Sequence, residues 1–141
     1  MSDNKSDDKS KHVVIVDDEE DITYIMAATL EMNGYRVKAF TNPSHAIDYF
    51  KKNGKNVDHL LVDVNMPDIS GFELINYIIP YNGSTKKYLM SGYVEPKHMN
   101  LIESLKSQGV VAGFLQKPFN PAEILSILNG TYKVRQEHHP F

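Results

Sequence analysis

Residues 59–67 read H-L-L-V-D-V-N-M-P, a short apolar run that ends in a single aspartate, Asp63. A run of this length, followed closely by proline, is typical of a buried strand of an α/β sheet. In open α/β sheets, ligands bind in the crevice at the carboxyl ends of the strands. We therefore predict that the Asp63 carboxylate lies in a ligand-binding crevice.

Two other apolar runs also end in charged residues. Residues 13–16 lead into the acidic pair Asp17 and Asp18, and residues 114–116 lead into Lys117. Because the carboxyl ends of parallel strands meet at one edge of a sheet, we expect the carboxylates and the ammonium to converge there. The acidic pair could also cap the helix that follows and complement its dipole, and we expect both roles.

Short apolar runs alternate with stretches of helical periodicity from residue 12 onward. Ser70 and Glu73 fit a capping box at one helix start, and Gly34, Gly109 and Gly130 follow the last periodic residues of three helices. The expected strands cover residues 13–16, 36–40, 59–63, 86–90 and 114–116. Five strands alternating with five helices predict an α/β fold, a doubly wound parallel sheet with helices on both faces.

The short chain favours the flavodoxin-like strand order 2-1-3-4-5. In this order the strands that end at Asp17 and Asp63 flank the point where the strand order reverses, which is where ligands bind. The polar residues 1–11 predict a disordered N-terminal tail, and residues 131–141 a C-terminal tail.

Composition excludes several classes of function. The chain has 141 residues, 41% of them hydrophobic, and a formal net charge of -3, which indicates one globular domain without a general attraction to nucleic acid. It contains no cysteine, so thiol chemistry and disulfides are excluded. Because no stretch resembles a secretory signal or a membrane span, we expect a cytoplasmic protein that contacts neither membrane nor DNA directly.

Converging carboxylates repel one another unless a cation lies among them. A hard divalent ion that prefers oxygen ligands suits such a site, and we expect Mg²⁺, with Mn²⁺ as an alternative. Carboxylates can also act as nucleophiles toward phosphoryl groups. Asp63 stands alone at the centre of the sheet and is the expected nucleophile, while Lys117 would stabilise the charge on the transferring group. Ser91 with Gly92, after the fourth strand, adds a hydroxyl to the same crevice.

Four motifs in order resemble those of the receiver domain of two-component response regulators, and the resemblance covers residues 12–130. The motifs are residues 13–18, residues 63–71 reading D-V-N-M-P-D-I-S-G, Ser91 with Gly92, and residues 117–119 reading K-P-F. The resemblance implies a stand-alone receiver like the chemotaxis and phosphorelay regulators, phosphorylated on Asp63 by a histidine kinase or a histidine phosphotransfer protein. It also implies a cis peptide bond between Lys117 and Pro118.

The resemblance further assigns roles to individual residues. Mg²⁺ would be held by Asp17, Asp18, Asp63 and the backbone carbonyl of Asn65. Ser91 and Phe114 would rearrange together on phosphorylation, although Phe114 lacks the hydroxyl that many such aromatic residues carry. The side chains of Asn65 and Tyr93 would modify the rate at which water reaches the acyl phosphate.

The chain departs from the family in one region. Lys117 follows Ser91 by 26 positions (91 to 117), about one helical turn more than is usual in such domains. The extra length falls near the fourth helix, which with the fifth strand and fifth helix forms the face that a downstream protein, or a second copy, would contact.

Two alternative functions remain open from the sequence. One is a binding module of the same fold that is never phosphorylated. The other is a Mg²⁺-dependent phosphatase with an aspartyl nucleophile, which would need a general acid two residues after Asp63, where the chain has Asn65. The preferred interpretation is a signalling switch that catalyses only its own phosphorylation and dephosphorylation and is not otherwise an enzyme.

Overall fold

The computed structural model describes residues 10–133. Five parallel strands form one sheet in the order β2-β1-β3-β4-β5, as predicted. The strands are β1 (His12–Val16), β2 (Arg36–Phe40), β3 (His59–Asp63), β4 (Lys86–Ser91) and β5 (Gly113–Gln116). The predicted strands match these to within a residue or two at either end. β1 and β3 are adjacent, with Val16 opposite Val62, so the residues after these two strands emerge side by side.

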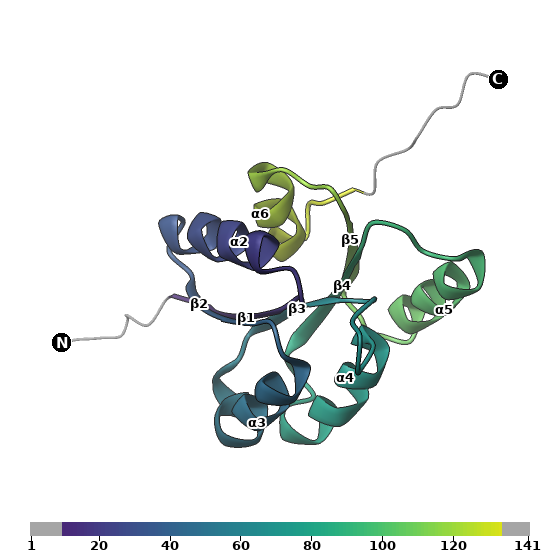
Figure 1. Ribbon diagram of the computed structural model, residues 1–141, viewed down its shortest axis with the longest axis horizontal. Coiled ribbons are helices and arrows are strands. Elements are labelled where there is room, and N and C mark those ends of the chain that lie inside the picture. Colours follow the sequence, from purple (N-terminus) through teal and green to yellow (C-terminus); the bar gives the residue numbers. More distant parts are fainter. Residues whose placement is uncertain (1–9, 134–141) are drawn as a thin grey trace.

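Five α-helices connect and follow the strands, as predicted. They are α2 (Glu20–Met32), α3 (Pro43–Asn53), α4 (Gly71–Ile78), α5 (Pro96–Ser107) and α6 (Pro121–Asn129), with 3₁₀ turns at Gly54–Asn56 and Ile79–Tyr81. Helices α2 and α6 cover one face of the sheet, and α3, α4 and α5 cover the other (Figure 1). The doubly wound fold is therefore confirmed.

Local sequence signals account for the helix ends. The predicted capping box is present at α4, where the Ser70 side chain accepts from the Glu73 amide and Glu73 accepts from the Ser70 amide. The glycines that end α2 and α6, Gly34 and Gly130, have φ angles of 92° and 78°, which other residues rarely adopt.

The predicted capping of α2 by the acidic pair is wrong in its detail. The N-cap residue is Glu19, and its side chain makes no capping hydrogen bond. Asp17 is close enough to help, because its Oδ1 accepts from the Glu19 amide at 3.0 Å. The Asp17 carboxylate also contacts Lys117, so it belongs to the site at the end of the sheet.

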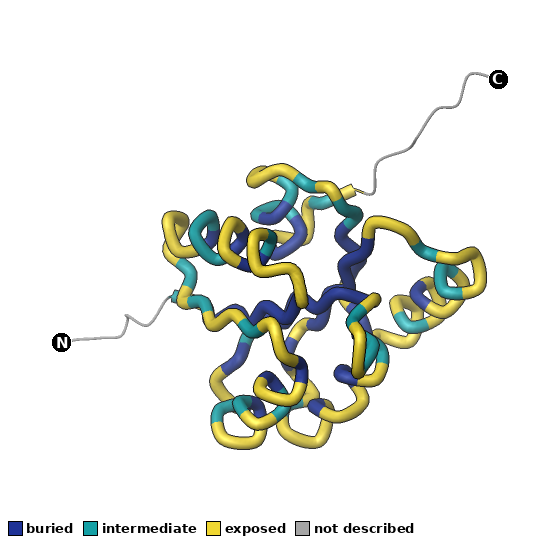
Figure 2. The backbone as a smooth tube through the Cα atoms, in the orientation of Figure 1, coloured by how far each residue is buried: buried dark blue, intermediate teal, exposed yellow. Residues whose placement is uncertain are grey.

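Two apolar layers hold the sheet between the helices. β1 and β3 are buried along their whole length, as expected for central strands of a parallel sheet covered on both faces. Figure 2 shows the buried residues concentrated along the strands and the exposed ones on the outer sides of the helices. β2 is an edge strand and is mostly exposed. Packing of this kind fixes the strand ends, and hence the groups that follow them, in space.

No helix within residues 10–133 is long and apolar enough to span a membrane. The tail predictions for residues 1–11 and 131–141 fall largely on residues 1–9 and 134–141, which lie outside the described part of the chain.

Candidate acidic site at the carboxyl end of the sheet

The structure brings together the three carboxylates that the sequence singled out. Ligand oxygens of Asp17, Asp18 and Asp63 all lie within 4.8 Å of one another. Asp17 follows β1 and is fully buried, Asp63 is the last residue of β3 and is 5% exposed, and Asp18 is exposed. The predicted cluster therefore has a dry side and an open side, through which a ligand can enter.

Lys117 is the cation of the site. Its Nζ lies 2.7 Å from Asp17 Oδ2 and 3.5 Å from Asp63 Oδ2. The peptide bond between Lys117 and Pro118 is cis, as the resemblance implied. The position of Lys117 after β5 is fixed by its backbone amide, which donates to the Ser91 carbonyl of β4 at 2.9 Å.

The electrostatics of the site oppose the charge on Asp63. Burial raises the pKa of the Asp63 carboxyl to about 6, and the nearby negative charge of Asp17 adds to the rise, although Lys117 partly offsets it. Burial likewise raises the pKa of Asp17. Burial alone would lower the pKa of Lys117, but its contacts with Asp17 and Glu19 hold the pKa above its usual value. The lysine therefore stays charged, and negative charge exceeds positive charge around it.

The donor set fits a hard divalent cation. Three carboxylates face one ammonium, and an added cation would relieve the repulsion that raises the pKa of Asp63. Oxygen ligands of this kind suit Mg²⁺, which binds through one or two carboxylates and keeps several waters. The backbone of Asn65 lies beside the cluster, since its amide donates to Asp63 Oδ1 at 3.3 Å.

A hydrogen-bonded group connects the site to the loop after β4. Ser91 Oγ donates to the Tyr93 carbonyl at 2.7 Å and accepts from the Tyr93 amide at 3.2 Å. The Asn65 side-chain amide donates to Ser91 Oγ at 3.1 Å and to the Tyr93 carbonyl at 3.4 Å. The hydroxyl of Ser91 is thus directed toward the loop rather than toward Asp63.

Phe114 lies in the core beneath this loop and is 6% exposed. It lines a cavity of ≈ 280 Å³ together with Ser91, Tyr93 and Met99 among others. Tyr93 itself is 72% exposed. The structure therefore places Ser91, Phe114 and Tyr93 around one cavity next to the acidic site.

Sequence reasoning missed two contacts of the site. Glu19 Oε1 lies 2.9 Å from Lys117 Nζ, a contact that the sequence analysis did not predict. The bond from Asn65 to Ser91 was also not foreseen. Neither contact has a local sequence signal, because the partners are 98 and 26 positions apart.

Comparisons with known proteins identify the class. The family model described as "Response regulator receiver domain" matches residues 13–129. This chain belongs to that family, the receivers of two-component systems.

Individual relatives agree with this assignment. The chain is 28% identical over 118 residues to the regulatory protein VanRc of Enterococcus gallinarum, covering 83% of this chain and 48% of that protein. It is 26% identical over 135 residues to the response regulator SaeR of Staphylococcus aureus, covering 91% of this chain and 54% of SaeR. The chain thus spans about half the length of the curated relatives it matches.

Solved structures show the same fold. The chemotaxis protein CheY4 of Vibrio cholerae superposes with a TM-score of 0.73 at 28% identity, over 86% of this chain and 98% of that one. A CheY-like receiver domain from Methanospirillum hungatei, at 22% identity, has a TM-score of 0.75 over 86% of this chain and 93% of its own.

Proposed function

We propose that Asp63 accepts a phosphoryl group from a histidine kinase or histidine phosphotransfer protein in a Mg²⁺-dependent reaction, and that the domain acts as a phosphorylation-controlled switch. The observation that carries the proposal is the convergence of Asp17, Asp18 and Asp63 within 4.8 Å beside the Lys117 ammonium. In this proposal Asp63 is the acceptor, Asp17 and Asp18 help to hold Mg²⁺, and Lys117 pairs with the transferred phosphoryl group.

Asp63 is the nucleophile in this proposal. Its carboxylate would attack the phosphorus while the donor's phosphorus–nitrogen bond breaks, giving an acyl phosphate on Asp63 and a free histidine on the donor. Mg²⁺, held by Asp17, Asp18, Asp63 and the Asn65 carbonyl, would neutralise charge on the phosphoryl oxygens. Lys117 already contacts Asp63 Oδ2 and would pair with a phosphoryl oxygen after transfer.

Ser91 would pass the change to the rest of the domain. To reach a phosphoryl oxygen, its hydroxyl must leave the Tyr93 carbonyl, which it now contacts at 2.7 Å. The loop after β4 loses that bond, and the cavity beside Phe114 offers room for the aromatic ring to move. The affected surface is formed by α5, β5 and α6, where a downstream protein or a second copy would dock.

The side chains of Asn65 and Tyr93 would modify the lifetime of the acyl phosphate. Both residues are exposed at the entrance to the site. We propose further that residues 12–130 form the receiver unit, that it works in the cytoplasm, and that it has no separate substrate to turn over.

Intact mass after incubation with acetyl phosphate tests the proposal. We expect a single phosphoryl adduct that requires Mg²⁺, that is absent from Asp63→Asn, and that is retained in Asp68→Asn, a matched change at an exposed aspartate five positions later. Absence of an adduct in the wild type under every condition would favour the unphosphorylated binding module. Steady release of phosphate from an ester substrate would favour the phosphatase.

A further inference from the structure

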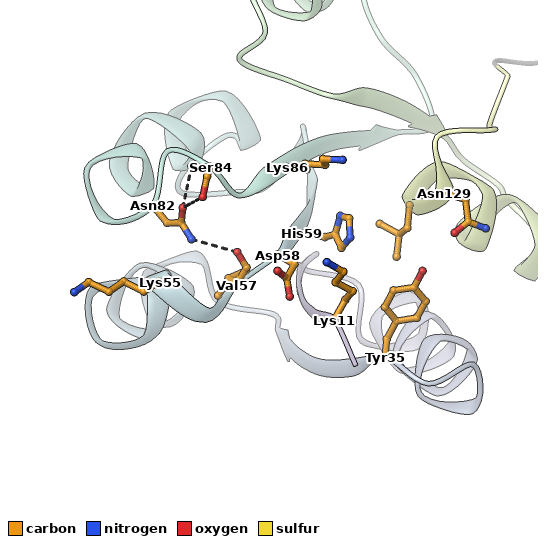
Figure 3. Close-up of a pocket in the computed structure, with 11 residues that line it drawn as sticks. Lys11, Tyr35, Lys55, Val57, Asp58, His59, Asn82, Ser84, Lys86 and Asn129 are labelled. Atoms are coloured by element: carbon orange, nitrogen blue, oxygen red, sulfur yellow. Dashed lines mark hydrogen bonds between the residues drawn. The ribbon is translucent and has the colours of Figure 1, made fainter. Parts of the chain in front are cut away.

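A cavity of ≈ 350 Å³ lies at the end of the sheet opposite the acidic site. Its walls come from residues at the amino ends of β1, β3 and β4 and from the ends of α2 and α6, including Lys11, Tyr35, His59, Lys86 and Asn129 (Figure 3). β3 therefore carries His59 at this cavity and Asp63 at the acidic site. The volume of the cavity lies within the range of small-molecule sites, roughly 300–1,000 Å³.

Two ammonium groups flank the buried ring of His59 in this cavity. The side chains of Lys11 and Lys86 lie on either side of the ring, whereas that of Lys55 points away from it (Figure 3). The ion pairs found among residues 10–133 involve Lys97 and Lys117, and none involves Lys11 or Lys86. The positive charge at the cavity is therefore not neutralised by an ion pair within the described part of the chain.

A single carboxylate, that of Asp58, lines the cavity, and it is already engaged. Its Oδ2 accepts a hydrogen bond from the backbone amide of His12 at 2.8 Å, which fixes it against β1. Lys55 also lines the cavity, and the Tyr35 phenol and the Asn129 amide add neutral hydrogen-bonding groups. The lining thus combines three lysines, two of them beside the His59 ring and without an ion pair among residues 10–133, with neutral groups that can donate to an anion.

His59 is a buried ring among these charged groups. The ring is 7% exposed, its Nδ1 lies 3.3 Å from the Tyr88 hydroxyl, and the ring of Tyr35 meets it edge-on at a centroid distance of 6.4 Å. Burial lowers the pKa of His59, the negative charge of Asp58 opposes this, and the charges of Lys86 and Lys11 add to the lowering. An anion between the lysines would reverse the effect of their charges on the ring.

We propose that this cavity binds a small anion carrying two or more negative charges, such as a diphosphate, which bridges Lys11 and Lys86 across the His59 ring. Binding would relieve the repulsion among the two ammonium groups and favour protonation of His59, so affinity should rise as the pH falls through the range in which the histidine titrates. The site is independent of the proposed phosphorylation of Asp63.

Calorimetric titration with inorganic pyrophosphate in Mg²⁺-free buffer, together with NMR of the His59 ring, tests the proposal. We expect one saturable site and a raised His59 pKa in the complex. The double variant K11A/K86A should bind at least tenfold more weakly. The matched double variant K51A/K52A, which removes two exposed lysines from α3, should bind as the wild type does. Asp63→Asn should also bind normally, which separates this site from the acidic one.

A parallel titration with citrate distinguishes phosphate recognition from recognition of charge alone. Binding of pyrophosphate supports the proposal whether or not citrate also binds. Three outcomes would overturn it. The first is the absence of saturable binding of either anion. The second is an equal loss of affinity in both double variants, which would indicate an adventitious ion only. The third is a loss of binding in Asp63→Asn.

Discussion

Asp63 is held in an environment that disfavours its charge until a cation arrives. Its pKa is about 6 in the folded protein and 3.8 in the absence of the fold. The folded state therefore binds a proton more tightly than the unfolded chain does. The stability that this group contributes is fully present below about pH 4 and is lost as the pH rises through about 6. A shift of this size corresponds to about 3 kcal/mol.

Replacement of the carboxyl by an amide should remove this pH dependence. We expect metal-free Asp63→Asn to be more stable than the wild type at pH 7.5, by up to about 3 kcal/mol, and nearly equal to it at pH 4. Urea unfolding of both proteins at the two pH values, with chelator present, measures the difference. The exposed control Asp68→Asn should match the wild type throughout, and a gain for Asp63→Asn that is the same at both pH values would contradict the explanation.

The Asn65 amide stabilises the orientation of Ser91 toward the Tyr93 carbonyl. A hydrogen bond of this kind contributes about 1 kcal/mol, or about a fivefold change in an equilibrium. We therefore expect Asn65→Ala to shift the unphosphorylated protein toward its activated conformation by about that factor. NMR chemical shifts of the Ser91 and Phe114 amides measure this change. Those of the variant should lie between the shifts of the unmodified wild type and the shifts of the phosphorylated wild type. Unchanged shifts in the variant would exclude a restraining role for Asn65.

Residue-level prediction succeeded where strand ends determine position. Asp17, Asp63, Ser91 and Lys117 could be placed because an apolar run ending in a polar residue specifies both a strand and its exit point. The contact between Glu19 and Lys117 could not be predicted. The Glu19 side chain is 60% exposed, so neither burial nor periodicity restricts its direction.

Helix α4 begins in close contact with the strand that presents Asp63. A Cβ on Gly71 would lie 2.5 Å from the Asp63 carbonyl oxygen, and the Gly71 amide donates to the Val64 carbonyl at 3.0 Å. The first turn of α4 therefore rests on the backbone that presents Asp63. This contact explains why the motif that begins at Asp63 ends in a glycine.

A methyl group at position 71 should separate α4 from β3. We expect Gly71→Ala to destabilise the protein by about 1–3 kcal/mol through overpacking and to slow phosphorylation by acetyl phosphate. Thermal unfolding and the rate of adduct formation measure the two effects. Gly83→Ala is the matched control, because its Cβ would meet nothing closer than 3.9 Å. Equal behaviour of the two variants would show that the close approach has no consequence.

At the scale of elements, the strands and helices could be predicted because buried central strands read as continuous apolar runs and because Gly, Pro and capping residues mark the helix ends. The start of β5 was placed one residue late. Gly113 is its first residue and has no side chain to register in an apolar pattern, although it is buried against Ile127 of α6. The N-cap of α2 was misassigned because the acidic residues there form a continuous run.

The whole domain should respond to Mg²⁺ as a ligand of its folded state. Because the unfolded chain has no preformed cluster of carboxylates, a Mg²⁺ concentration of about 100 times the dissociation constant should add about 2.7 kcal/mol of stability. We expect a thermal shift of several degrees in the wild type and none in Asp17→Asn. Glu19→Gln, which alters a Lys117 contact outside the proposed ligands, should keep the shift. A full shift in Asp17→Asn would remove Asp17 from the ligand set.

The chain closes over one edge of its own sheet after α6. The amide of Gln116 in β5 donates to the Tyr132 hydroxyl at 3.2 Å. At the other edge, β2 exposes Arg36 and Lys38. Unpaired backbone at a sheet edge is a template for adding strands from other molecules, and natural proteins prevent this by covering the edge or placing charge on it. One edge here has a covering residue and the other has charge, so both are protected against aggregation by edge-to-edge pairing. Tyr132→Phe would remove this hydrogen bond at the edge and should make the protein more prone to form intermolecular β-structure at high concentration.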